Sequence, residues 1–575
     1  MKNSDSQIEK NITRVESGIL IAVLMECLLS GGGFFRLSQY LISALVLLGI
    51  MILVMCRKVF FIKWNTHMLF LIIMLAGALV TLKTGIDFSD SMYGVFRVLA
   101  MGLLWLLIIQ TEEESRVFCI RLIPWIGLAT TTLAVPARLI PWIYDRMFSA
   151  GRWNGPFFYP NTTALFLLVG SVIAQQKESG RKRLILMTGL GAGILLTGSR
   201  TVFILTILYV IYRILHYGIK EKRKFHPWIL QIIRIICLVI AAGSGICLLS
   251  GENMLKRVFS IGLNESTLQG RLLYWEDALP MIIRNPFGLG YMGYFYLQQE
   301  LQTGVYSVRY VHNELLQCAL DFGILPAVMM TYLFLQTILE RGTAGWKKEI
   351  IILTALHCLV DFDLQFLAIV FLLFLLEEGK GKHVICMKKS IVILSGVIPV
   401  GVLCFFMTAE IFAVNGNYVE ACRWIPWSTE YQTGKMLQSE NLDEAAEMAE
   451  RLISENSYLY VAYKILGNWN AGKGNVEEYA QNQGRVLSLR KYEIEEYEEY
   501  ISVLADLYIR KRLVGKEAEA QKCISYLEQV PELLLEAKRS TSVRAYRIEE
   551  KPYLILDEEF DILMDQLLRT GGGRE

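Results

Sequence analysis

The stretch LSQYLISALVLLGIMILVMCRKVFFIK (residues 37–63) decides the fold class of this chain. Residues 37–56 are almost entirely apolar, and a helix needs about 20 such residues to cross the hydrocarbon core of a membrane. The loop at 57–63 then carries Arg57, Lys58 and Lys63. An apolar helix followed by a short basic loop is typical of a membrane span that ends at the cytoplasmic surface.

The same alternation continues over most of the chain. Of the 575 residues, 54% are hydrophobic, and the mean hydropathy is +0.39. A soluble globular protein has roughly 45–50% apolar residues even when Gly is counted, so this class is excluded. Residues 17–412 are apolar with short basic interruptions, whereas residues 413–575 are polar and rich in Glu. We therefore predict an all-α, polytopic membrane protein: a cytoplasmic segment 1–16, a membrane domain 17–412, and a small α-helical domain 413–575.

Apolar segments of sufficient length predict about 12–13 spans. They lie near residues 17–35, 37–56, 66–82, 92–110, 117–136, 162–175, 184–198, 201–215, 228–250, 314–338, 349–361, 364–376 and 391–412. The two short pairs at 184–215 and 349–376 are each compatible with a broken hairpin instead. No small-residue cleavage site follows the polar start, so we expect no cleavable signal peptide.

The distribution of Lys and Arg predicts the orientation. A cytoplasmic N-terminus places nearly all the basic loops in the cytoplasm, namely 57–63, 111–116, 177–183, 220–224, 341–348 and 377–389. The opposite, extracytoplasmic face then holds loop 137–161, the turns at 198–200 and 361–363, loop 251–313 and the domain 413–575. We expect six chemically notable residues to share that face: Arg152, Arg200, Arg271, His312, Asp361 and Asp363. Ionised groups are costly near hydrocarbon, so this collection predicts a site for an anionic substrate.

Each of these residues also has a purely structural interpretation. Arg152 precedes the turn-forming run GPFFYPN, in which Asn161 is a candidate N-cap, and Arg200 follows a Gly-rich span and could extend its side chain to the membrane surface. His312 stands at a helix start, where it could cap the helix. Histidine accepts protons near neutral pH, which makes His312 the natural base of the group. Asp361 and Asp363 could orient an arginine or cap a membrane hairpin, and the sequence leaves this open.

The first half of loop 251–313 predicts an amphipathic helix. Its apolar positions recur at helical spacing and comprise Leu272, Trp275, Ala278, Leu279 and Ile282, with Glu276 and Asp277 on the other side. Such a helix either lies flat on the membrane or covers a lipid substrate as a lid. Arg271 opens it, and a helix N-terminus favours an anion.

The sequence gives little indication of metal or disulfide chemistry. Nine of the 11 cysteines lie in or beside apolar segments and have neither disulfide nor metal-ligand spacing, whereas Cys422 and Cys523 lie in the domain 413–575 and could pair there. The extracytoplasmic segments contain no DxD-type metal motif before a basic pocket. We therefore expect neither a metal ion nor a cofactor.

Five motifs occur in a characteristic order over residues 90–380. They are GRWNGPFFYPNTTA, LLTGSRT, GRLLYWEDALPMIIRNPFGLGYMGYF, VHNELLQCALDFGILP and HCLVDFDLQF. Together they resemble the O-antigen ligase and polymerase superfamily. The resemblance implies an all-helical membrane glycosyltransferase that takes a glycan from an undecaprenyl-diphosphate-linked donor without a metal or a nucleotide sugar. It places Arg200 and Arg271 near the donor diphosphate, and it makes His312 the residue that activates the acceptor hydroxyl.

We accordingly predict a catalytic set and a substrate-binding set. The catalytic set is His312, Arg271 and Arg200, and the substrate-binding set is Arg152, Asn161, Tyr310, Asn313 and Asp361. Guanidinium groups would stabilise the leaving diphosphate, and direct attack by the acceptor would invert the anomeric configuration. The acceptor, whether glycan, lipid or protein, is not specified by these residues, nor is the choice between ligase and polymerase.

Two other function classes remain open. A transporter or flippase for lipid-linked oligosaccharides would also need basic residues, but it would have them on both sides of the membrane. A protein O-oligosaccharyltransferase would use the same chemistry on a protein acceptor. Nothing in the sequence indicates nucleic-acid binding, and we expect a multi-pass protein of the cell membrane with the domain 413–575 outside the cytoplasm.

The domain 413–575 contains a weak internal repeat. Residues 441–457 and 474–490 align at an offset of about 32–34 residues, close to the tetratricopeptide period of 34. Two or three such repeats form a small solenoid that could bind a protein partner or extend the catalytic cavity. A generic helical domain is the alternative.

Overall fold

The computed structural model describes residues 2–137, 140–220, 234–235, 237–239, 265–377 and 383–571, and within these ranges the chain is almost entirely helical. The helices up to residue 414 are α1 (Lys2–Leu29), α2 (Arg36–Arg57), α3 (Thr66–Thr84), α4 (Phe88–Ile109), α5 (Glu113–Ala137), α6 (Pro141–Met147), α7 (Pro160–Lys177), α8 (Gly180–Thr197), α9 (Arg200–Lys220), α12 (Ser266–Arg284), α13 (Gly293–Leu301), α14 (Glu314–Phe322), α15 (Ile324–Leu339), α16 (Gly345–Cys358), α17 (Leu367–Leu376) and α18 (Lys389–Val414). The prediction of an all-α polytopic membrane protein is confirmed.

Five of these helices, α2, α3, α4, α5 and α18, are long and apolar enough to cross a membrane, and α15 and α17 are shorter apolar helices. They enclose one large apolar core that extends from α1 to α18. The predicted total of about 12–13 spans stays a prediction. The span expected at 228–250 and the first part of loop 251–313 lie outside the described residues, apart from 234–235 and 237–239.

Two short sheets interrupt the helices. Strands β1 (Val59–Trp64) and β4 (His383–Lys388) pair antiparallel, with Phe61 opposite Cys386. Both strands come from loops that we predicted to be cytoplasmic, and their pairing places these loops on the same side of the bundle. The second sheet is the small hairpin of β2 (Phe148–Ser149) and β3 (Arg152–Trp153).

The segment 314–338, predicted as one span, consists of two helices that meet at Gly323. This glycine has φ +99°, and a Cβ atom there would lie 2.9 Å from the carbonyl oxygen of Pro286. The backbone of residues 286–289 packs into the break, because Ile324 N donates to Pro286 O at 3.0 Å and Leu289 N to Leu320 O at 2.6 Å. The predicted span is therefore not one continuous helix, because only a residue without a side chain fits the close approach of the preceding loop at Gly323.

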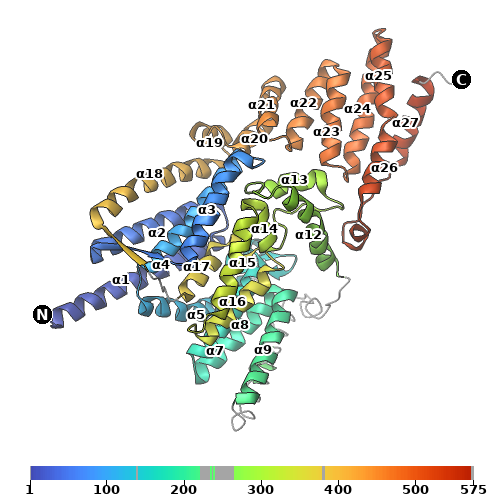
Figure 1. Ribbon diagram of the computed structural model, residues 1–575. Coiled ribbons are helices and arrows are strands. Elements are labelled where there is room, and N and C mark those ends of the chain that lie inside the picture. The colour runs from blue at the N-terminus through green and yellow to red at the C-terminus, as the bar shows by residue number, and fades with distance from the viewer. Residues whose placement is uncertain are drawn as a thin grey trace.

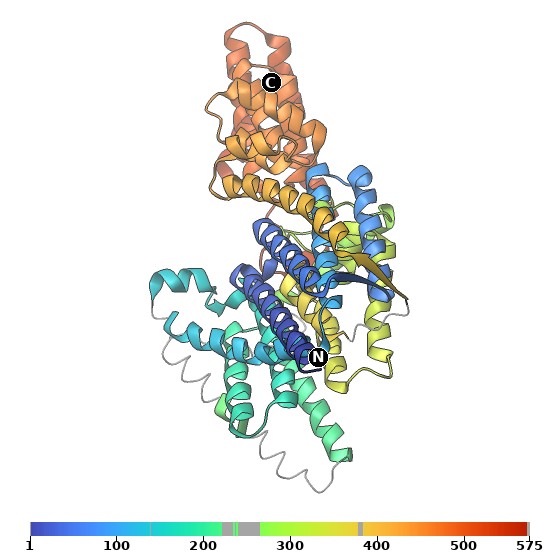
Figure 2. The same ribbon diagram turned by 90° about the vertical axis from the view of Figure 1, so that its left-hand side faces the viewer.

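The domain after residue 414 is an elongated array of helices that stack side by side (Figures 1 and 2). They are α19 (Tyr418–Trp424), α20 (Thr429–Leu437), α21 (Leu442–Glu455), α22 (Tyr460–Lys473), α23 (Val476–Leu489), α24 (Ile494–Leu513), α25 (Glu517–Leu527), α26 (Val530–Ser540) and α27 (Glu558–Gly571). Helices α21 and α23 begin 34 residues apart, and so do α22 and α24, which agrees with the predicted offset. Assignment to the tetratricopeptide class stays a prediction.

This C-terminal array docks onto the rest of the protein at two places. Near its start, Asn456 donates to Asp87 Oδ2 at 3.0 Å, and Glu430 pairs with Arg36 at 2.8 Å. Near its end, the short helix η5 (Val543–Arg547) packs on α12. Helices α12 and α13 consequently lie between the array and the rest of the bundle (Figure 1).

Candidate functional site

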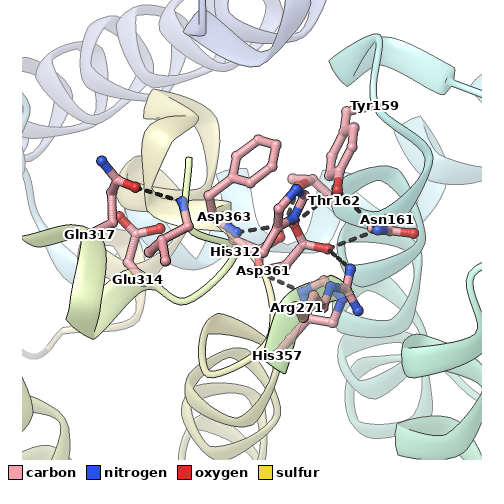
Figure 3. A network of polar contacts seen from close by, with 12 residues as sticks. Tyr159, Asn161, Thr162, Arg271, His312, Glu314, Gln317, His357, Asp361 and Asp363 are labelled. Carbon is pink, nitrogen blue, oxygen red and sulfur yellow. Dashed lines mark hydrogen bonds and ion pairs between the residues drawn. The ribbon is translucent and has the colours of Figure 1, made fainter. Parts of the chain in front are cut away.

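The carboxylate of Asp361 is the centre of a buried polar network (Figure 3). It stands in the turn after α16, with an exposed fraction of 0%. Its Oδ2 accepts hydrogen bonds from Arg271 Nη2 at 3.1 Å and Asn161 Nδ2 at 2.8 Å. Its Oδ1 accepts one from the Tyr159 hydroxyl at 2.9 Å and lies 3.4 Å from His312 Nδ1. Three sequence-distant segments thus converge on one carboxylate, and of the two interpretations left open, Asp361 orients an arginine.

The GRWNGPFFYPN run folds into a support for this network. A tight turn with positive φ at Ala150 and Gly151 joins β2 to β3, which suits the twist of a two-residue hairpin. Pro160 then occupies the first turn of α7, where its missing N–H costs nothing. Asn161 is accordingly a residue of α7 and not its N-cap, and its side chain is free to reach Asp361.

Arg152 acts on the same network from one step further away. Its Nη2 donates to Asn161 Oδ1 at 2.6 Å, and its Nε donates to the carbonyl of Thr197 at 2.8 Å. The guanidinium therefore ties β3 to the end of α8 and fixes which end of the Asn161 amide faces Asp361. Arg152 belongs to the site as a residue that positions Asn161.

His312 is held in an unusual backbone conformation. Its φ is +52°, in the left-handed region that is unfavourable for residues other than glycine. The backbone on one side is fixed by Trp275 Nε1, which donates to Val311 O at 3.1 Å. On the other side Asn313 caps α14 through its Oδ1 and donates to Leu359 O at 2.9 Å. Strain that the surroundings maintain in this way is concentrated at functional sites in proteins.

The capping function considered for His312 thus belongs to its neighbour. Asn313, predicted to bind substrate, has both ends of its amide engaged by backbone groups. The His312 ring remains 20% exposed, beside the fully buried Asp361. Of His312 and Asp361, only His312 is accessible to solvent and to a substrate.

Arg271 is carried by α12, which begins at Ser266 and so places the guanidinium in its second turn. The predicted amphipathic pattern is only partly correct. Leu279 is 49% exposed, whereas Asp277 is buried and accepts hydrogen bonds from Thr303 N, Thr303 Oγ1 and the Tyr306 hydroxyl at 2.7–2.9 Å. The reason is that loop 302–310 folds back over α12 and covers the face expected to be polar. Burial raises the pKa of Asp277, although these three hydrogen bonds oppose the shift.

Arg200 lies at the first position of α9 and forms an ion pair with Glu265, the residue that precedes α12. Both side chains are about one-quarter exposed, 24% for Arg200 and 27% for Glu265. Its described ion pair thus connects it to the N-terminal end of the Arg271 helix, not to Asp361. The three arginines of the predicted site are therefore linked to one another through α12, Asp361 and Asn161.

A second histidine–aspartate pair, to which no function was assigned from the sequence, lies behind the first. His357 Nδ1 and Asp363 Oδ2 are 2.5 Å apart, both side chains are fully buried, and Thr162 Oγ1 donates to Asp363 Oδ1 at 2.8 Å. A histidine inside an apolar segment is itself a signal of this kind, because ionisable residues are rare there without a partner. The HCLVDFD spacing offered Asp361 and Asp363 as that partner.

The turn that carries both aspartates is braced from its other side. The buried Glu314 accepts from Gln365 Nε2 at 2.8 Å and from Leu364 N at 3.3 Å. Arg97 of α4 donates to Gln365 O at 3.3 Å. These contacts hold residues 361–365 rigidly, which keeps the Asp361 carboxylate in one orientation.

Asp361 is ionised in this environment. Burial alone would raise the pKa of its carboxyl, but the charge of Arg271 and the hydrogen bond from His312 outweigh burial and bring the pKa far below the ordinary value. A charged carboxylate beside an imidazole holds that ring in one orientation. The arrangement can accept a proton at His312 while Arg271 faces an anion.

Comparison with known families supports this part of the chain. Residues 184–331 match the family model described as O-antigen ligase. The predicted resemblance to the O-antigen ligase superfamily is confirmed. No curated protein and no solved structure matches the chain in the two further comparisons. The matched segment contains Arg200, Arg271 and His312, while Arg152, Asn161 and Asp361 lie outside it. The match supports a ligase or polymerase role with cell-surface glycans for this part of the chain.

Proposed function

We propose that this protein transfers a glycan from an undecaprenyl-diphosphate-linked donor to an acceptor hydroxyl on the extracytoplasmic face of the cell membrane. The observation that carries the proposal is the Arg271–Asp361–His312 arrangement, in which one buried carboxylate contacts a guanidinium and an imidazole. Arg271 and His312 both come from the O-antigen ligase segment.

The chemistry assigns one function to each group. The acceptor oxygen attacks the anomeric carbon and forms the new glycosidic bond, while the bond from that carbon to the diphosphate oxygen breaks. The acceptor proton passes to His312, whose Nδ1 faces Asp361 and whose Nε2 is thus directed to the substrate. The diphosphate leaves with one additional negative charge, which Arg271 and Arg200 stabilise. Direct displacement inverts the anomeric configuration.

The location of the charged groups favours transfer over transport. Arg152, Arg271, His312 and Asp361 meet in one network, as a reaction centre requires. A flippase pathway would instead need basic groups distributed along the whole crossing. The positive-inside pattern supports a position of this network, and of the C-terminal array, outside the cytoplasm.

The test is a deletion strain complemented with variants of the full-length protein. We expect Arg271→Ala and His312→Ala to restore no glycan transfer, and Arg284→Ala to restore the parental level. Arg284 is a suitable matched control because it is exposed and lies at the far end of the same helix, 13 residues beyond Arg271. If the Arg271→Ala and His312→Ala proteins are made, inserted and still transfer glycan at the parental rate, the proposal is wrong.

The glycan profile of the same strains separates the ligase from the polymerase. Loss of the chain-length distribution indicates a polymerase of repeat units. Long lipid-linked chains that accumulate without reaching an acceptor indicate a ligase, and loss of glycan from a protein alone indicates a protein O-oligosaccharyltransferase.

A further inference from the structure

A large cleft opens where the C-terminal array meets the helical bundle, next to the candidate site. Its volume is about 640 Å³, within the range of about 300–1,000 Å³ that is usual for ligand pockets. One wall comes from the start of α2, the start of α4 and helix α13. The opposite wall comes from the end of α18 and from α20, which contributes Thr429, Glu430 and Thr433.

The lining combines aromatic rings with fixed charges. Eight aromatic side chains line the cleft, among them Phe295, Tyr296 and Tyr310. Arg36 pairs with Asp90 and with Glu430, and its guanidinium lies 4.7 Å from the centre of the Tyr93 ring. The Tyr296 hydroxyl donates to Asp90 Oδ2 at 2.8 Å. The charged groups are therefore held rigidly by one another between flat apolar surfaces.

This combination fits a saccharide. A sugar ring presents C–H faces that pack on aromatic rings, and peripheral hydroxyls that form strong hydrogen bonds with ionised groups. A lipid chain would leave the charged groups unsatisfied. A diphosphate would meet three carboxylates (Asp90, Glu410 and Glu430) against the guanidinium groups of Arg36 and Arg309.

The cleft adjoins the reaction centre through a wall of rings. The ring centre of Tyr310, which lines the cleft, lies 4.9 Å from that of Phe362. The Phe362 ring in turn contacts the His312 ring, with 5.0 Å between the two ring centres. Phe158 also lines the cleft, and the next residue is the Tyr159 whose hydroxyl donates to Asp361. The rings of Tyr310 and Phe362 therefore separate sugars in the cleft from His312.

We propose that this cleft binds the saccharide rings of the glycan substrate, and that α20 of the C-terminal array forms one wall of the binding site. This inference rests on the proposed function, because it gives the cleft a part in glycan transfer. The C-terminal array then contributes directly to substrate binding, because Glu430 and Thr433 of its helix α20 line the cleft.

The experiment measures binding separately from transfer. The probe is a set of oligosaccharides released by mild acid from the cell-surface polysaccharide of the producing cells, titrated calorimetrically into full-length purified protein. We expect Thr433→Trp, which fills the cleft from the α20 side, and Phe295→Ala, which removes a stacking surface, each to weaken binding about ten-fold. Leu437→Trp is the matched control, because it adds the same ring at a 59% exposed position of the same helix, outside the cleft.

Parental affinity in both cleft variants, with an unchanged unfolding temperature, would overturn the cleft assignment. Because Phe295→Ala inserts nothing, it remains informative if Thr433→Trp fails to fold. Competition by lipid-linked glycan extracted from the deletion strain assigns the cleft to the donor's sugars, and absence of competition assigns it to the acceptor's sugars.

His312→Ala distinguishes a failure of this proposal from a failure of the proposed function. If both hold, His312→Ala binds the oligosaccharides with parental affinity and transfers nothing. If the cleft assignment alone fails, the cleft variants bind normally and His312→Ala still abolishes transfer. If the transfer mechanism alone fails, His312→Ala retains transfer and the cleft variants still lose binding.

Discussion

Two histidine–aspartate pairs lie close together in this protein, and they differ in their access to solvent and in the presence of a neighbouring arginine. In the first, the ring of His312 is 20% exposed, and Asp361 also accepts from Arg271, Asn161 and Tyr159.

In the second, His357 and Asp363 are both fully buried, and His357 Nε2 has no hydrogen-bond partner among the described residues. The contact between imidazole and carboxylate is therefore not what identifies a catalytic base. An opening to the substrate and an adjacent arginine are what distinguish the first pair, and each prediction below tests that distinction.

The largest expected effect is on transfer in Asp361→Asn. Replacing the charge removes the partner that orients His312 and Arg271, so transfer should fall by about 10⁴-fold, the size found where a carboxylate orients a catalytic histidine. The rate of transfer to the acceptor in membranes containing the variant is the measurement. Asp363→Asn, two residues further along, is the matched control and should retain most of the transfer per folded molecule. Equal losses of transfer in Asp361→Asn and Asp363→Asn would show that the two histidine–aspartate pairs do not differ in function.

The second effect is on stability in His357→Ala. This change leaves the buried Asp363 without its imidazole, and breaking a buried pair by removing one partner costs about 3–5 kcal/mol. The midpoint of thermal unfolding should fall clearly, while the transfer rate per folded molecule changes little. His312→Ala should show the reverse pattern. Loss of transfer in a stable His357→Ala protein would place the second pair in the mechanism.

The third prediction concerns pH. The pKa of Asp361 is lowered in the folded protein, so its charge stabilises the fold above the ordinary aspartate pKa of about 3.9, and this stabilisation is lost as the pH falls below that value. The difference in unfolding temperature between the parental protein and Asp361→Asn should be largest above about pH 5 and should shrink below about pH 4. A difference that stays constant between pH 7 and pH 3 would show that the carboxylate is not held in its charged form.

The smallest expected effect comes from the C-terminal array and concerns only the first pair. Arg544 of η5 donates to both carboxylate oxygens of Glu276 and to Gln269 Oε1 at 2.7 Å. Both partners belong to α12, so Arg544 stabilises the position of the helix that carries Arg271. A partly exposed ion pair contributes about 0.2–1 kcal/mol, and Arg544→Ala should therefore slow transfer by about two- to five-fold.

Arg539→Ala provides the comparison for Arg544→Ala, because Arg539 pairs with Glu532 inside the array. It should leave the transfer rate unchanged. If Arg544 acts through Glu276, the double variant Arg544→Ala with Glu276→Ala should be no slower than the slower single variant.

The sequence predicted the helical class and the participants of the first pair because these depend on local patterns. Hydropathy identifies helices that cross a membrane, and the order of motifs brought Arg271, His312 and Asp361 into one hypothesis. The choice between orienting an arginine and capping a hairpin for Asp361 required the structure, since its partners are 49–202 positions away in the chain. Local periodicity contains no information about such distant contacts.

The features that were missed share this cause. Asp277 was assigned to a polar face because a helix pattern shows alternation but not the loop 302–310 that covers it. Gly323 was placed inside one span because hydropathy is continuous across it, although the backbone turns there. The Arg36–Glu430 pair joins the cleft walls of α2 and α20, although the two residues lie 394 positions apart in the sequence.

The contact of η5 with α12 also relates the function of this protein to the time of its synthesis. Arg544 follows Glu276 by 268 positions. At about 5–20 residues per second, a ribosome needs roughly 15–50 s to make that interval. For most of this time the segment with Arg271 and His312 is already made but lacks the contact with η5. We expect a chain interrupted between α18 and η5 to contain every predicted catalytic residue and yet to have low activity, so that full activity appears only in molecules whose synthesis has passed η5.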